Sequence, residues 1–205
     1  MSSPAILLPS ALERPLEFLT FPLGEVPRGA WTEIAGPASS GRTAFLCSLL
    51  AAASAERDYC ALIDTQNTFN PEDAAQAGVR LSQVLWVRCA GHVEHALKAT
   101  DWLARAGGFG LVALDLGDTP VAVSHRIQLA AWFRLRHAVE NTRTALVSLS
   151  QRVHAPSCSA LKIELCRERV VWRGMGPGRM LAGLTVAAGN IRHHRKRESV
   201  VTIAC

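Results

Sequence analysis

A short stretch near residue 40 has the residue types and the spacing of a phosphate-binding loop. It begins and ends in glycine, and glycines allow backbone dihedrals that turn successive N–H groups inward. The apolar run that follows predicts a helix whose positive end points at the same spot, so loop and helix together can cradle a phosphate anion. The candidate residues of this nucleotide site are Gly36, Ser39, Ser40, Gly41, Arg42 and Thr43.

The loop departs at one position from the pattern G-x-x-x-x-G-K-[ST] of nucleotide-binding proteins. Arg42 stands where that pattern has lysine. It keeps the positive charge, but its planar guanidinium is bulkier than an ammonium and cannot occupy the same slot between two phosphates. The sequence therefore predicts a phosphate site with altered chemistry.

The elements around the loop alternate between apolar strand-like runs and helix-like runs. This alternation is typical of a mostly parallel, twisted sheet with helices on both faces and ligands at the carboxyl ends of the strands. We therefore expect the α/β fold class. The predicted strands are Trp31–Ala35, Cys60–Asp64, Val84–Cys89, Leu111–Leu114 and Thr144–Ser150, and the predicted helices cover 42–55, a short segment from Pro71, 92–106 and Ser124–Glu140 with Ser124 as its N-cap.

The last part of the chain has a different pattern. Leu161–Arg167, Arg169–Arg173 and Leu181–Ile191 resemble consecutive strands joined by turns, which predicts an antiparallel C-terminal edge. Before the loop, residues 1–20 are expected to form an arm or short helix, and residues 21–205 a single core domain. The arm has an apolar side that either folds back onto its own core or docks onto another protein chain; its residues are Leu12, Leu16, Phe18 and Leu19.

Composition narrows the class of protein. With 205 residues and 49% hydrophobic content, the chain suits one globular domain with ample material for a core. It has no apolar run of the ~20 residues that span a bilayer and no export signal at its start, so a cytoplasmic location is expected. The six cysteines form no C-x-x-C pair, and His92 and His95 have no third ligand nearby, so no metal site is predicted. Four of the tryptophans, Trp86, Trp102, Trp132 and Trp172, lie in apolar runs and are expected to pack in the core.

The net charge of +5 is divided unevenly along the chain. Residues 1–120 hold 8 Lys and Arg against 13 Asp and Glu, whereas residues 121–205 hold 14 against 4. A basic half can contact nucleic acid or an acidic protein surface, or it can be a solvated face. The candidate contact residues are Arg126, Arg134, Arg136, Arg152, Arg195, Lys196 and Arg197.

The order of these segments, rather than the loop alone, resembles the RecA recombinase family over roughly residues 21–191. The matching segments are Phe21–Gly29, Gly36–Thr43, Leu62–Pro71, Ala77–Val79, Val112–Asp115, Ser150–Arg152 and Ala160–Lys162. Within that family the chain is most similar to the ImuA group, RecA-like accessory proteins of the damage-induced mutagenesis machinery of bacteria.

The resemblance assigns roles to several polar residues. Thr43 and Asp115 match the family's hydroxyl and carboxylate for Mg²⁺, and Gln151 matches the residue that senses the terminal phosphate. Gln66 stands where the family has the glutamate that activates water. An amide cannot accept that proton, so the resemblance implies a degenerate site without ATPase activity, requiring no cofactor, although ATP or ADP with Mg²⁺ could still occupy it.

The same resemblance implies a function and partners. We expect a non-catalytic adaptor in SOS-induced translesion DNA synthesis, which binds an ImuB-like Y-family polymerase homologue, an error-prone C-family DNA polymerase and RecA itself. Two alternatives stay open. One is a weak ATPase or nucleotide-switched DNA-repair module in which Arg42 takes over the phosphate contact, and the other is a basic DNA-binding module. The segments that in RecA proteins form DNA-binding loops, Leu116–Val123 and Arg152–Ser159, are short here.

Overall fold

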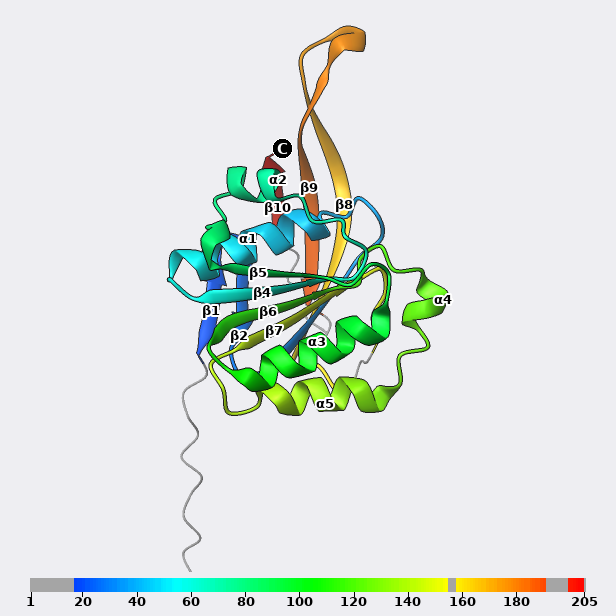
Figure 1. The fold of residues 1–205 in the computed structure, drawn as a ribbon. Coiled ribbons are helices and arrows are strands. Elements are labelled where there is room, and N and C mark those ends of the chain that lie inside the picture. Colours follow the sequence, from blue (N-terminus) through cyan, green and yellow to red (C-terminus); the bar gives the residue numbers. More distant parts are fainter. Residues whose placement is uncertain (1–16, 155–157, 191–198, 205) are drawn as a thin grey trace, which may run out of the picture.

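A single large sheet forms the centre of the molecule (Figure 1). The computed structural model describes residues 17–154, 158–190 and 199–204. Within them the strand order is β10-β9-β8-β3-β7-β6-β4-β5. The strands from β5 to β8 in this order are parallel, and β9 and β10 are antiparallel, which confirms the predicted α/β class and its antiparallel edge. Their bounds are β3 (Trp31–Ala35), β4 (Tyr59–Asp64), β5 (Val84–Arg88), β6 (Phe109–Asp115), β7 (Ala145–Ser150), β8 (Leu161–Arg173), β9 (Met180–Asn190) and β10 (Ser199–Ala204).

Helices cover both faces of the sheet, with α1 on one face and α3 and α5 on the other (Figure 1). The strands between these layers are mostly apolar, as expected of strands covered on both faces, and every residue of β3 is buried, including the polar Thr32 and Glu33. No helix in the described ranges is long and apolar enough to cross a membrane. The helices are α1 (Arg42–Ala55), α2 (Pro71–Gln76), α3 (Val93–Ala106), α4 (Val121–Ser124) and α5 (Leu129–Val139), with 3-10 turns η1 (Leu81–Gln83) and η2 (Gly176–Gly178).

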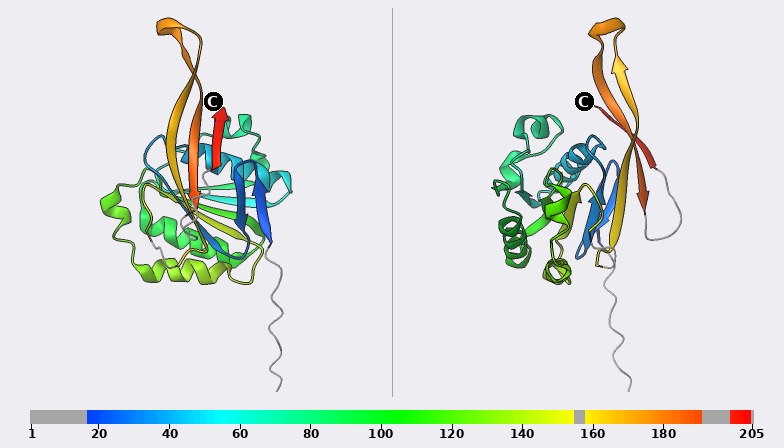
Figure 2. Two further views of the ribbon diagram at one scale, coloured as in Figure 1. Left: turned by 180° about the vertical axis from the view of Figure 1, so that it is seen from behind. Right: turned by 90° about the vertical axis from the view of Figure 1, so that its right-hand side faces the viewer.

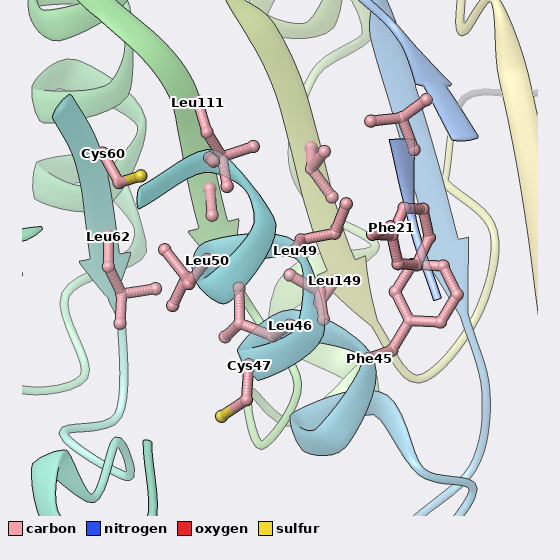
Figure 3. Packing of buried hydrophobic residues seen from close by; sticks show 14 of the residues in the cluster. Phe21, Phe45, Leu46, Cys47, Leu49, Leu50, Cys60, Leu62, Leu111 and Leu149 are labelled. Carbon is pink, nitrogen blue, oxygen red and sulfur yellow. The ribbon is translucent and has the colours of Figure 1, made fainter. Parts of the chain in front are cut away.

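A two-stranded hairpin, β1 (Phe18–Phe21) and β2 (Gly24–Pro27), packs beside α1 and changes the predicted domain boundary. Phe21 and Phe45 meet edge to face at 4.9 Å in the core cluster shown in Figure 3. Leu19 is fully buried and Phe18 is 40% exposed. The predicted boundary between arm and core at residues 20 and 21 thus falls inside β1, because the apolar side chains of this strand complete the core. Leu12 and Leu16 lie outside the described residues.

The opposite face of the sheet packs around stacked aromatic rings. Trp31 and Trp132 are buried and parallel, with centroids 4.8 Å apart and planes 1° apart. The prediction that the tryptophans pack in the core is correct for Trp132 but wrong for Trp102 and Trp172, which are 71% and 48% exposed. These two lie on the outward sides of α3 and β8, where apolar neighbours in the sequence do not imply a covered face.

The helix predicted over Ser124–Glu140 is broken in two. Pro120, which suits a helix start, precedes α4, so a first short helix begins earlier than predicted. Ser124 is its last residue, not an N-cap, and its hydroxyl donates to the carbonyl of Val121. The backbone then becomes extended at Gln128, and α5 begins at the next residue. This break shapes a groove described below.

The strands predicted at Leu161–Arg167 and Arg169–Arg173 are one continuous strand, β8. The pairing register with β9 shifts between Arg167 and Arg169, so the intervening residue is accommodated as a bulge and the ladder continues. The outer part of the β8–β9 hairpin projects well beyond the body of the molecule (Figures 1 and 2). The C-terminal edge is therefore an arm as well as the end of the sheet.

Candidate functional site

The loop that joins β3 to α1 has the backbone of an anion cradle. Ser39 and Gly41 adopt left-handed dihedrals, with φ of 60° and 90°. Gly41 is the N-cap of α1, no side chain caps this helix, and its first turn holds no acidic residue. The N–H groups of the first turn are therefore free of side-chain acceptors at the positive end of a 14-residue helix, which is the arrangement that binds phosphate.

The start of the loop is packed too closely for any side chain. A Cβ on Gly36 would lie 2.4 Å from Oγ of Ser40 and 2.7 Å from the carbonyl oxygen of Leu165. The amide of Gly36 donates to the carbonyl of Ser150 at 3.1 Å. Oγ of Ser40 is buried and has no hydrogen-bond partner in the described part of the chain. Only glycine fits here, and the loop is thereby held against β7 and β8.

Arg42 does not extend freely into this cradle. It is 8% exposed, and its Nη1 donates to the carbonyl oxygen of Gly117 at 2.7 Å. Its Nη2 lies 3.8 Å from Oδ1 of Asp118, a carboxylate that is 58% exposed. The guanidinium is thus bonded to the turn that follows β6. The sequence identified Arg42 but not its bond to Gly117, because a backbone carbonyl leaves no signal in the pattern of side chains.

Asp115 ends β6 and faces the same turn. Its Oδ1 accepts the amide of Gly117 at 2.7 Å. Burial is the largest cause that raises the pKa of Asp115 to about 6; the carboxylates of Asp64 and Asp118 act in the same direction, and the Gly117 amide and Arg42 act against it. A carboxyl group in this setting titrates close to neutral pH.

The turn after β6 is also held from the other side. Nε2 of Gln151 lies 3.5 Å from the carbonyl oxygen of Thr119, and the amide of Leu116 donates to the carbonyl of Leu149 at 2.8 Å. Arg42 and Gln151 therefore bond to backbone carbonyls of the same turn, that of Gly117 and that of Thr119. Gln151 has in this way a structural contact that the sequence did not predict.

Gln66 lies one strand further along the sheet. A Cβ added at Gly91 would lie 3.7 Å from Oε1 of Gln66, so the two residues are close neighbours. The Gln66 side chain makes no hydrogen bond within the described ranges. The loop that carries it is ordered by the buried Asp64, which accepts the amides of Thr68 and Phe69 at 3.1 and 3.0 Å. Asp64 was missed as a site residue, although an acidic residue closing an apolar strand was a visible signal.

The structure thus brings the predicted loop, Asp115 and Gln151 to one edge of the sheet, because β3, β7 and β6 are neighbours. Thr43 is exposed in the first turn of α1. The backbone half of the site fits a phosphate group, and Thr43 and Asp115 are the residues that would hold Mg²⁺ beside it. The loop carries Arg42 where the pattern of nucleotide-binding proteins has lysine, and Gln66 is an amide and not a carboxylate. No group of three or more His, Cys, Asp or Glu among the described residues is arranged to hold a metal ion by itself.

The predicted basic contacts that the structure describes lie on different elements. Arg126 and Arg134 line a groove between helices, and Arg136 pairs with Glu140 at 2.9 Å. Arg152 is exposed directly after β7. The remaining predicted contacts, Arg195, Lys196 and Arg197, lie outside the described residues.

The sequence matches the RecA N-terminal domain family over residues 16–173. Protein RecA of Rickettsia canadensis (strain McKiel) is 30% identical over 143 residues, which are 63% of this chain and 41% of that protein. The alignment thus covers less than half the length of this relative.

Proposed function

Because residues 16–173 match the RecA N-terminal domain, this chain belongs to the RecA family, and on that premise we propose that it is a RecA-like adaptor of DNA repair that does not hydrolyse ATP. One observation carries the proposal. The cation of the phosphate loop, Arg42, is buried and bonded to the Gly117 carbonyl of its own chain. A nucleotide would have to displace this bond before it gained the contact.

The position of Gln66 supports the same reading. An amide cannot act as the general base that activates water, and such a base is typically worth 10²–10⁴ in rate. The surrounding loop is fixed by the three bonds that Asp64 accepts, including one from Nε1 of Trp86 at 3.1 Å.

We place the adaptor in the ImuA-like branch of the family and in SOS-induced translesion synthesis in the cytoplasm. Its partners are then an ImuB-like polymerase homologue, an error-prone C-family polymerase and RecA. The support is the resemblance of the ordered segments together with a phosphate loop in which Arg42 and Gln66 replace the lysine and the glutamate of the family pattern.

The test is a mutation-frequency assay after DNA damage in a strain that lacks the gene. Complementation with the wild type, with Asp115→Ala and with Arg42→Ala should restore damage-induced mutagenesis equally, because neither side chain performs chemistry. Purified protein should release no phosphate from Mg-ATP above a buffer control. Loss of complementation by Asp115→Ala together with measurable ATP turnover would refute the proposal and favour the ATPase alternative.

A second candidate function, direct contact with DNA, is favoured by the β8–β9 arm. The described part of its outer end exposes four arginines and one glutamate, with Trp172 beside them, and a two-stranded ribbon of this size can enter a major groove. The guanidinium of Arg179 lies over the ring of Trp172 at 5.1 Å. The arginines are Arg167, Arg169, Arg173 and Arg179.

Salt dependence tests this second function. If the arm contacts phosphates, the logarithm of the affinity for duplex DNA falls linearly with the logarithm of salt concentration, and Arg169→Glu with Arg173→Glu reduces the slope by about 2. A slope near zero for the wild type would exclude phosphate contacts by the arm.

A further inference from the structure

A groove of about 500 Å³ lies between α3 and the segment that runs through α4 into α5. Its apolar lining includes Val93 and Leu97 from α3 and Ile127 and Ala131 from the opposite side. Val123, at the end of the short α4, is 42% exposed along the same groove. The break between α4 and α5 is what brings this side chain to the groove, since an unbroken helix would continue along a single axis.

The groove is bordered mainly by cations. Lys98 on α3 and Arg126 and Arg134 on the other side are exposed, and the one acidic residue of the lining is Glu94. None of the three cations forms an ion pair in the part of the chain that the structure describes. Arg136, which does not line the groove, is paired at 2.9 Å with Glu140, the residue that follows α5. The cations at the groove are thus available to an external partner.

We propose that this groove is a docking site for an acidic amphipathic helix of a partner protein. Helix α3 has 14 residues and is therefore about 21 Å long, and α5 lies beside it (Figure 1), so the two can receive a further helix of three to four turns. The apolar face of that helix covers Val93, Leu97 and Ile127, and its acidic flanks face the three cations.

The mixture of apolar floor and cationic border distinguishes this surface from one for nucleic acid. A phosphate backbone gains nothing from the apolar floor, whereas an amphipathic helix uses both features. The inference rests on the proposed adaptor function, because an adaptor needs a docking surface apart from its nucleotide loop.

The probe is a pair of synthetic 18-residue helical peptides labelled with fluorescein. Both carry the same leucine face, and the flanking positions are glutamate in one peptide and lysine in the other. Fluorescence anisotropy with the full-length protein should show binding of the acidic peptide and at least tenfold weaker binding of the lysine peptide. Arg126→Glu combined with Arg134→Glu should reverse this preference. The matched control, Arg169→Glu combined with Arg173→Glu on the β8–β9 arm, changes the charge equally and should leave the preference unchanged.

Equal binding of both peptides to the wild type, or the same result for the two double variants, would overturn the groove proposal. The adaptor function is tested separately in cells. Full complementation of mutagenesis by Arg126→Glu with Arg134→Glu would also overturn the groove proposal and would leave the adaptor function standing. If the Arg126→Glu, Arg134→Glu variant shows the reversed peptide preference but deletion of the gene leaves mutagenesis unchanged, the groove proposal is supported and the adaptor function is refuted.

Discussion

Replacement of Arg42 by lysine tests whether the arginine blocks its own phosphate site. The bond from Arg42 to the Gly117 carbonyl is 2.7 Å long and buried, and a hydrogen bond from a charged group contributes about 1.5–3 kcal/mol. The contact with Asp118, at 3.8 Å and largely exposed, adds at most a few tenths. A nucleotide that recruits the guanidinium must break the first bond, which weakens binding by about 10- to 150-fold.

Lysine relieves most of this loss because its ammonium is a single compact donor on a flexible stem. We therefore expect Arg42→Lys to bind Mg-ATP at least tenfold more tightly than the wild type. Calorimetric titration gives the dissociation constants, and the thermal midpoint checks them, since nucleotide at 100 times its dissociation constant stabilises the fold by about 2.7 kcal/mol. Arg105→Lys, at an exposed pair with Asp101 on α3, is the matched control.

Hydrolysis should not follow binding, because Gln66 still cannot accept a proton. Phosphate release should remain at background in Arg42→Lys and should rise only when Gln66→Glu is added. If the wild type and Arg42→Lys bind Mg-ATP with equal affinity, the bond from Arg42 to Gly117 does not weaken nucleotide binding. The idea that the arginine blocks its own phosphate site would then be wrong.

Three further predictions concern stability, each measured by urea denaturation. Burial raises the pKa of Asp115 to about 6 from an ordinary value near 4, so the folded state binds the proton more tightly than the unfolded state and loses stability as pH rises between these values. The variant Asp115→Asn should therefore unfold with a free energy at most about 3 kcal/mol higher than the wild type at pH 8 and equal to it at pH 4. An equal effect at both pH values would contradict this. Arg28 is buried, and its guanidinium donates to two carboxylates and two carbonyls. Because Glu56 and Asp58 are partly exposed, Arg28→Met should lower the free energy of unfolding by only about 2–4 kcal/mol. A loss below about 1 kcal/mol would mean that water replaces these bonds. Trp132→Ala should cost about 3–5 kcal/mol and remove the near-UV circular dichroism of the stacked pair, and an unchanged spectrum would refute the stacking.

The sequence was sufficient for elements whose pattern is repeated over several turns or along a buried strand. Helix α3 was located within one residue because its buried positions, from Val93 through Leu97 to Thr100, recur at helical spacing. The break after Ser124 was not found, since the residues on either side of it are all compatible with a helix. It depends on where Pro120 starts the first helix and on how the chain packs against α3.

The sequence was enough to predict at which edge of the sheet the site lies, but not which hydrogen bonds hold its side chains. Parallel strands end at one edge of the sheet, so the loop, Asp115 and Gln151 were expected to be close together. The acceptors that hold Arg42 and Gln151 are the carbonyls of Gly117 and Thr119, and every residue has a carbonyl. Which carbonyl lies within reach is decided by the turn geometry, which residue types alone do not determine.

The position of β3 in the sheet has a consequence for synthesis of the chain. Both of its neighbours, β7 and β8, come from much later in the sequence, and the bond from Trp31 to Ser148 joins residues 117 positions apart. At about 5–20 residues per second, a ribosome needs on the order of ten seconds to deliver them. For that interval a five-residue strand that is wholly buried in the finished fold has neither partner, and its backbone N–H and C=O groups stay open to pairing with other chains.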